Sequence, residues 1–300
     1  MRKLLLVSCA AFALSGCQTL DGLKTIGNAE SRAAEEAAAN SAKLAGILDA
    51  QDEDTKARYD ARNPQETVEF FGIEPGMTVV DTIAGQTWYA GILSDYLGTD
   101  GRVIAADYAV DMWALFGGFA NEEFLERRAS WPQTFVETAA ENIDEDDAPV
   151  SAFAFGSMPD EFAGTADVVM MVRAVHHLNR FEEDGDYFTK ALGDVATILK
   201  PGGILGVVQH RAPETNSDKA SEGDNGYVKQ SHVIAFIENA GFELVGTSEV
   251  NANPRDVPTD SDFVWRLPPT LGNSADDEEL RATYVAIGES DRMTLKFRKK

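Results

Sequence analysis

The chain has 300 residues, and 44% of them are hydrophobic, so it can form one large domain with attachments and a real core. Its 50 acidic and 26 basic residues give a formal net charge of −24. That charge excludes a general binder of nucleic acids or of anionic membrane surfaces, because like charges repel.

The N-terminus is organised like a bacterial export signal. Met1-Arg2-Lys3 is positively charged, and the apolar run 4–14 is too short to span a bilayer as a mature helix. The next segment, Leu14-Ser15-Gly16-Cys17, resembles the lipobox of bacterial lipoproteins, in which the chain is cleaved on the N-terminal side of a cysteine whose thiol is lipidated. We therefore expect residues 1–16 to be a signal peptide and Cys17 to carry a lipid; a plain secretory signal is the alternative.

A lipid on Cys17 would anchor the protein in the cell envelope, facing the periplasm. Gln18 is not the aspartate that often retains lipoproteins at the inner membrane, so the outer membrane is slightly favoured. The other cysteine, Cys9, leaves with the signal, so the mature chain would have no disulfide and no cysteine metal site. Residues 17–58 are alanine-rich and polar, which favours a partly helical tether, and we expect the domain to cover 59–300.

From Tyr59 onward, strand and helix patterns alternate. Val79 and Val80 predict a buried strand, and a helical period begins at Trp88 after a tight turn. Further strands are predicted at 101–107, 150–155, 167–172, 204–208, 242–250 and 293–297. Helices are predicted at 63–72, with Asn63 as N-cap, at 88–97, within 109–145, and at 188–199, 228–240 and 276–288. This order predicts an α/β three-layer sandwich whose first five strands are parallel.

Several segments of the chain match a known family. LKPGG at 199–203, the acids that end the first two strands and the element order resemble class I S-adenosylmethionine-dependent methyltransferases. The segments RNPQETVEFFGIEPGMTVVD, VVQHRAP, GYVK, NANP, WRLPPTL and GESDRMTLKF look like a bacterial family of predicted, often exported methyltransferases. The resemblance runs from about Tyr59 to the C-terminus and implies a seven-stranded, mostly parallel sheet of class I methyltransferase type. It implies no established substrate.

The resemblance also implies where S-adenosylmethionine would bind. A glycine-rich turn after the first strand approaches the methionine part, and the acid after the second strand accepts hydrogen bonds from the ribose. The implied cofactor-binding residues are Asp81, Gly85, Thr87, Asp107, Gly156, Ser157, Met158 and Arg173. The turn at 81–87 departs from the family pattern, because Gly85 is its only glycine.

Three of the four histidines lie near strand ends. His176 and His177 follow the fourth strand, and His210 with Arg211 follows the fifth, so these side chains could converge over one crevice. A neutral histidine can take a proton from an acceptor hydroxyl or amine, and arginine can hold a carboxylate or phosphate. We therefore predict His177, His210 and Arg211 as catalytic, with packing of the histidines against the sheet as the competing interpretation. His232 lies on a predicted helix and suits a structural role.

Zinc could bind three imidazoles, but the adjacent pair His176 and His177 would point in different directions on a strand, so we expect no metal. Three functions stay open. The first is methyl transfer to a small or peripheral acceptor. The second is a non-catalytic envelope lipoprotein that uses the fold as a binding or scaffold module. Export favours it, because no supply of S-adenosylmethionine is expected outside the cytoplasm. The third is another reaction, such as hydrolysis with His210 and Arg211.

Overall fold

The computed structural model describes residues 17–83, 88–141 and 143–300, and it describes side chains from residue 30 onward. The chain divides into two compact units, Met1–Lys43 and Leu44–Lys300. Helix α1, Cys17–Ala50, supplies the described part of the first unit and the start of the second. Within the described ranges, no helix combines the length and the apolar character that crossing a bilayer requires.

The second unit begins inside the segment that the sequence assigned to the tether. Leu44 and Leu48 are buried in a core cluster of this unit. Two short helices follow, α2 (Glu53–Lys56) and α3 (Tyr59–Arg62), which the sequence pattern did not predict. Helix α3 matters for the site, because Arg62 in it and its N-cap residue Arg58 both line a cavity.

The sheet has the order β3-β2-β1-β4-β5-β8-β7, and a short strand, β6, pairs with β5 off this path. The parallel strands are β1 (Thr78–Thr82), β2 (Arg102–Asp107), β3 (Val150–Ala154), β4 (Ala166–Val172), β5 (Leu199–Ala212) and β6 (Val228–Lys229). The last strand, β8 (Arg292–Lys299), is antiparallel to both β5 and β7 (Phe242–Ser248). The predicted seven-stranded, mostly parallel sheet of class I methyltransferase type is therefore confirmed.

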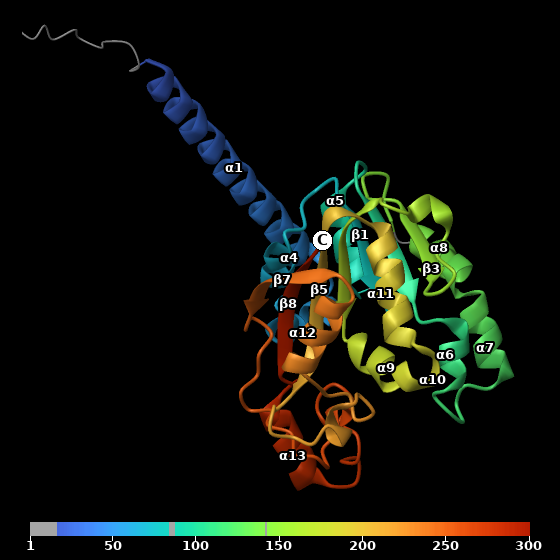
Figure 1. The fold of residues 1–300 in the computed structure, drawn as a ribbon. Coiled ribbons are helices and arrows are strands. Elements are labelled where there is room, and N and C mark those ends of the chain that lie inside the picture. Colours follow the sequence, from blue (N-terminus) through green and yellow to red (C-terminus); the bar gives the residue numbers. More distant parts are fainter. Residues whose placement is uncertain (1–16, 84–87, 142) are drawn as a thin grey trace, which may run out of the picture. The chain divides into compact units, whose positions relative to one another are not determined.

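Helices cover both faces of the sheet, as Figure 1 shows for α11 and α12 on one face. The helices are α4 (Pro64–Phe71), α5 (Trp88–Leu97), α6 (Val110–Ala114), α7 (Glu122–Ala129), α8 (Trp131–Ala140), α9 (Val175–Arg180), α10 (Glu182–Gly185), α11 (Tyr187–Ile198), α12 (Gln230–Asn239) and α13 (Glu278–Ile287). Successive strand residues point to opposite faces, so Val80 joins one core cluster and Val79 the other. The three-layer arrangement follows from this alternation.

Three local features differ from the sequence predictions. LKPGG at 199–203 lies inside β5, which starts at Leu199. Asn63 precedes α4 as predicted, but its side chain donates to the Val250 carbonyl at 2.8 Å and does not cap the helix. His176 and His177 lie in helix α9, which the pattern did not show, because six residues are too few for a helical period.

Candidate functional site

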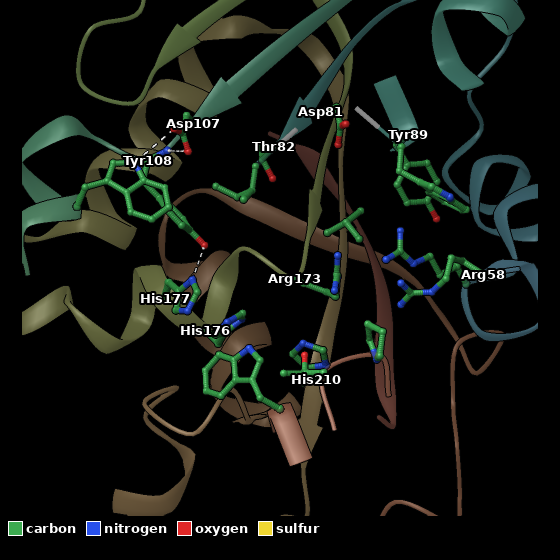
Figure 2. A pocket seen from close by; sticks show the side chains of 18 of the residues that line it. Arg58, Asp81, Thr82, Tyr89, Asp107, Tyr108, Arg173, His176, His177 and His210 are labelled. Atoms are coloured by element: carbon green, nitrogen blue, oxygen red, sulfur yellow. Dashed lines mark hydrogen bonds between the residues drawn. The ribbon is translucent and has the colours of Figure 1, made fainter. Parts of the chain in front are cut away.

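A cavity of about 450 Å³ opens over the carboxyl ends of β1, β2, β4 and β5 (Figure 2). Ligand pockets typically hold about 300–1,000 Å³, so a small molecule fits. The cavity lies where the strand order reverses, between β1 and β4, which is where doubly wound sheets bind ligands. Its lining is mainly charged and aromatic. The polar side chains that line it include Arg58, Arg62, Asp81, Asp107, Tyr108, Arg128, Arg173, His176, His177 and His210.

Two strands end at the cavity in a strained backbone conformation. Ile83, after β1, has φ 59°, and Arg173, after β4, has φ 57°. A non-glycine residue costs about 1–3 kcal/mol there, and the β-branched Ile83 is a real outlier. Strain of this kind is concentrated at functional sites. After β4 the strained residue is Arg173 itself, and its side chain reaches into the centre of the cavity in Figure 2.

Asp107, the predicted ribose-binding acid, ends β2 and lines the cavity. Its Oδ1 accepts a hydrogen bond from the Tyr108 backbone N–H at 2.8 Å. Its Oδ2 accepts from Arg128 Nη1 at 3.1 Å and from Trp113 Nε1 at 3.3 Å. Burial raises the pKa of Asp107, and the Arg128 guanidinium opposes that shift. A carboxylate oxygen can accept two hydrogen bonds, so Oδ1 can accept one more, from a ligand hydroxyl.

Asp81 ends β1 and is 3% exposed. Burial raises its pKa to about 7, although the Ala90 N–H at the start of α5 and the nearby Arg173 and Arg62 favour the ionised form. Asp81 can therefore hold or release a proton near neutral pH. The sequence predicted only a cofactor contact here, because the depth of burial that shifts this pKa depends on the whole fold.

His177 is held in one tautomer by Tyr108. The Tyr108 hydroxyl donates its single hydrogen to the Ala174 carbonyl at 3.0 Å, so it must accept from His177 Nδ1, also at 3.0 Å (Figure 2). The Nε2 atom of His177 then carries the free lone pair. Burial, together with His176 and Arg180, lowers the pKa of His177 to about 2. The ring is thus a neutral hydrogen-bond acceptor and a weak base.

His176 is oriented by Gln209. The Gln209 Oε1 atom accepts from the backbone N and the Nδ1 of His176, both at 3.2 Å, and its Nε2 donates to the Gly226 carbonyl at 2.9 Å. Burial lowers the pKa of His176 to about 4. The rings of His176 and His177 lie 3.9 Å apart and both line the cavity, because they are in a helix and not on a strand. This corrects the expectation that they point apart.

His210 lies on the same cavity, and its Nδ1 is 2.6 Å from the Ser290 hydroxyl. Burial and the neighbouring His176 hold the pKa of His210 well below its ordinary value. The structure therefore brings His177 and His210 to one cavity. Among the residues that the structure describes, no group of three or more His, Cys, Asp or Glu side chains could hold a metal ion.

Arg211 does not reach this cavity. Its guanidinium donates to Asp291 Oδ2 at 2.8 Å and to Glu249 Oε2 at 2.7 Å, and it lines a separate cavity. Neighbouring residues on a strand point to opposite faces, so Arg211 cannot follow His210 into the same space. This corrects the expectation that the two side chains converge.

The loop after β3 also lies outside the main cavity. Gly156 and Ser157 line another cavity of about 430 Å³, and the Gly156 N–H donates to Asp194 Oδ2 at 2.6 Å. Met158 packs against the hydrophobic core. The predicted cofactor residues Gly85 and Thr87 lie outside the described residues.

Several cavity residues were not predicted from the sequence. Arg58 is the N-cap residue of α3, Arg62 lies in α3, and Arg128 lies in α7. No local sequence pattern marks these arginines as site residues. They lie in or next to helices before β1 and after β2, and only the packing of those helices brings them to the strand ends. Tyr108 directly follows Asp107 at the end of the second strand, and this position is the one sequence feature that could have identified it as a cavity residue.

The buried histidines predict an acid-sensitive fold. Unfolded His176 takes up a proton below its ordinary pKa of 6.5, but the folded form does so only near 4, so stability falls as pH drops between these values. Asp81 has the opposite effect on stability. Between pH 3.8 and about 7 the folded form binds a proton that the unfolded form has lost, so this group stabilises the fold as the pH drops. We expect His176→Asn to reduce the pH slope by about one proton, or about 1.4 kcal/mol per pH unit. Denaturant unfolding across this window measures it; a slope equal to that of the wild type would contradict it.

The strand order and the cavity at the reversal point define a class I methyltransferase-like fold. No protein-family model matches the sequence, and no curated protein is similar to it. Similar solved structures include an S-adenosylmethionine-dependent methyltransferase from Aquifex aeolicus, with TM-score 0.43 and 21% identity, covering 69% of this chain and 93% of that chain.

Two further similar structures have comparable scores. Geranyl diphosphate C-methyltransferase from Streptomyces coelicolor has TM-score 0.47 and 11% identity, covering 81% of this chain and 80% of that chain. The arsenic(III) S-adenosylmethionine methyltransferase of Chlamydomonas reinhardtii has TM-score 0.44 and 14% identity, covering 86% and 73%. At this level the comparisons carry no conclusion about activity, because one fold serves many functions.

Proposed function

We propose that the chain binds S-adenosylmethionine over the sheet and transfers the methyl group to a small or peripheral acceptor. The observation that supports this most is the position of Asp107. It ends β2 beside a cavity of ligand size, where the class I fold uses an acid to bind a ribose.

The cavity side chains suit this cofactor at two points. Asp107 Oδ1 has room for a ribose hydroxyl, and the Arg173 guanidinium could hold the carboxylate of the methionine part. When bound, the cofactor supplies an electrophilic methyl group on a sulfonium. Tyr108 and Trp113 pack edge to face beside Asp107, with ring centroids 5.3 Å apart, and would keep water from the sugar side.

The chain's own residues would then position the acceptor and manage its proton. The lone pair on His177 Nε2 can accept a hydrogen bond from an acceptor hydroxyl or amine and so orient it. With a pKa of about 2, His177 does not keep that proton at neutral pH. Asp81, with a pKa of about 7, can hold it, which gives Asp81 a different role from the cofactor contact predicted from sequence.

Methyl transfer itself can be tested with an envelope extract and methyl-tritiated S-adenosylmethionine. We expect the wild type to transfer label, and Asp81→Asn to lower the rate about a hundredfold or more, because general acid–base groups contribute that much. The pH dependence near neutrality should disappear with it. Asp276→Asn, on an exposed loop residue, is the matched control. An unchanged rate in Asp81→Asn would remove this residue from the mechanism.

A non-catalytic binding module is the second candidate. Asp107 Oδ2 is already bonded to Arg128 and Trp113, and burial holds the pKa of each cavity histidine below its ordinary value. Such a site can bind a ligand without handling protons. Saturable binding of S-adenosylhomocysteine, with no labelled product in any envelope extract, would favour this candidate.

We also propose that the mature chain begins at Cys17 and is held in the envelope by its lipid, facing the periplasm. The support is the positive start, the short apolar run and Leu14-Ser15-Gly16-Cys17. We expect Cys17→Ser to move the protein from the membrane fraction to the soluble fraction of cells, since each buried methylene contributes about 0.8 kcal/mol. Cys9→Ser is the matched control and should change nothing. Retention of Cys17→Ser on the membrane at wild-type levels would contradict the anchor.

A further inference from the structure

The side of the cavity next to α3 carries an excess of arginine. Arg58, Arg62 and Arg173 all line it. Arg62 is 7% exposed, and its Nε is buried without a hydrogen-bond partner among the described residues. Its guanidinium carbon lies 4.6 Å from the centre of the Trp88 ring, which holds the group in place.

The charges around the cavity do not balance. Arg58 and Arg292 share Glu289, and Arg128 pairs with Asp107. Arg62 and Arg173 have no ion pair within the described ranges, although the charges of Asp81 and of the shared Glu289 interact with both. The undescribed stretch 84–87, Ala-Gly-Gln-Thr, contains no charged residue that could compensate.

This imbalance is unusual for the chain. Four arginines but only two carboxyl groups are among the described residues that line the cavity, whereas the whole chain has a formal net charge of −24. A buried charge without a partner is costly, so such sites normally hold a counter-ion or a ligand of opposite charge. The neutral histidines leave the excess unchanged.

The proposed cofactor would not remove the excess. S-adenosylmethionine has a sulfonium, an ammonium and a carboxylate, so it brings one net positive charge. If its carboxylate bound Arg173, Arg62 would still lack a partner. The methyl acceptor, which would share the cavity with the cofactor, is therefore the molecule that can bring the negative charge.

We propose that the methyl acceptor is an anion, and that Arg62, with Arg58 beside it, binds its carboxylate or phosphate group. The planar guanidinium forms two parallel hydrogen bonds to either group, and it is already held against Trp88. Naming the anion as the acceptor rests on the proposed function, but the binding of the anion does not.

The test measures binding to the purified full chain by calorimetry, with inorganic phosphate, acetate and S-adenosylhomocysteine as separate probes. We expect phosphate or acetate to bind, and the tighter of the two identifies the acceptor's group. Arg62→Met should weaken that probe about tenfold or more, because a charge-assisted hydrogen bond is lost. The affinity of Arg62→Met for S-adenosylhomocysteine should stay within about threefold of the wild type, since Arg62 contacts the anion and not the cofactor in this proposal. Arg127→Met, on an exposed arginine paired with Glu123, is the matched control and should bind normally.

Each result separates this inference from the proposed function. Binding of S-adenosylhomocysteine without phosphate or acetate binding would overturn the anion site alone. Anion binding without S-adenosylhomocysteine binding would overturn the methyltransferase proposal and leave the anion site standing. Equal weakening by Arg62→Met and Arg127→Met would reduce the effect to overall charge and overturn the site.

A second variant guards against misfolding of Arg62→Met. Arg62→Lys keeps the charge but loses the planar fork, so it should fold and weaken the anion about threefold to tenfold. Unchanged anion affinity in a folded Arg62→Lys protein would also overturn the site. Circular dichroism of both variants checks the fold.

Discussion

Gly223→Ala should destabilise the domain by about 2–6 kcal/mol, because it combines a strained backbone angle with overpacking. Gly223 has φ +100°, and a Cβ atom there would lie 2.1 Å from the His176 carbonyl oxygen and 2.8 Å from its carbon. Both neighbours are backbone atoms of α9, so neither can rotate away. Since a domain is stable by about 5–15 kcal/mol, this loss would remove a large share of the free energy of unfolding.

Gly241→Ala is the matched control for this effect. Gly241 has φ +98°, but a Cβ atom there would meet nothing within 4 Å. It should therefore cost only the backbone term, about 1–3 kcal/mol. Denaturant unfolding of both variants measures the difference. Equal losses would mean that the close approach of Gly223 to His176 contributes nothing.

Asp107→Asn should weaken S-adenosylhomocysteine binding about tenfold to a hundredfold, since hydrogen bonds to a charged group contribute about 1.5–3 kcal/mol. The amide has nearly the same shape as the carboxylate, but it lacks the charge that a ribose hydroxyl would meet. Titration calorimetry measures the affinity. An affinity equal to that of the wild type would show that the sugar does not meet this carboxyl group.

The ion pair with Arg128 complicates that result, because Asp107→Asn also leaves Arg128 without its partner. Arg128→Met breaks the same pair from the other side and leaves the carboxylate in place. We expect it to bind S-adenosylhomocysteine within about threefold of the wild type, since the methionine stem still covers Trp113. A loss as large as that of Asp107→Asn would assign Asp107 a purely structural role.

The fold could be predicted because its signals are local. Buried strands such as β4 read as continuous apolar runs, and Gly241 ends α12 where the helical period stops. Parallel strand ends meet at one edge, so Asp81 and Asp107 were expected at the cavity and lie there. His177 and His210 also reach it, although the first does so from an unpredicted helix.

The rest of the site depends on contacts between distant parts of the chain. The ion pair of Arg58 with Glu289 joins residues 231 positions apart, and no local pattern encodes such a pairing. The low pKa of His177 and the raised pKa of Asp81 come from burial by several elements at once. The prediction for Arg211 was wrong because a strand pattern locates the strand but does not show which cavity each side chain at its end will line.

The most direct test of the methyltransferase proposal is calorimetric titration of the purified wild-type chain with S-adenosylmethionine and with S-adenosylhomocysteine. We predict saturable heat with a single site for both ligands, and competition between them. No heat with either ligand at millimolar concentration would contradict the proposal that a nucleoside cofactor binds beside Asp107.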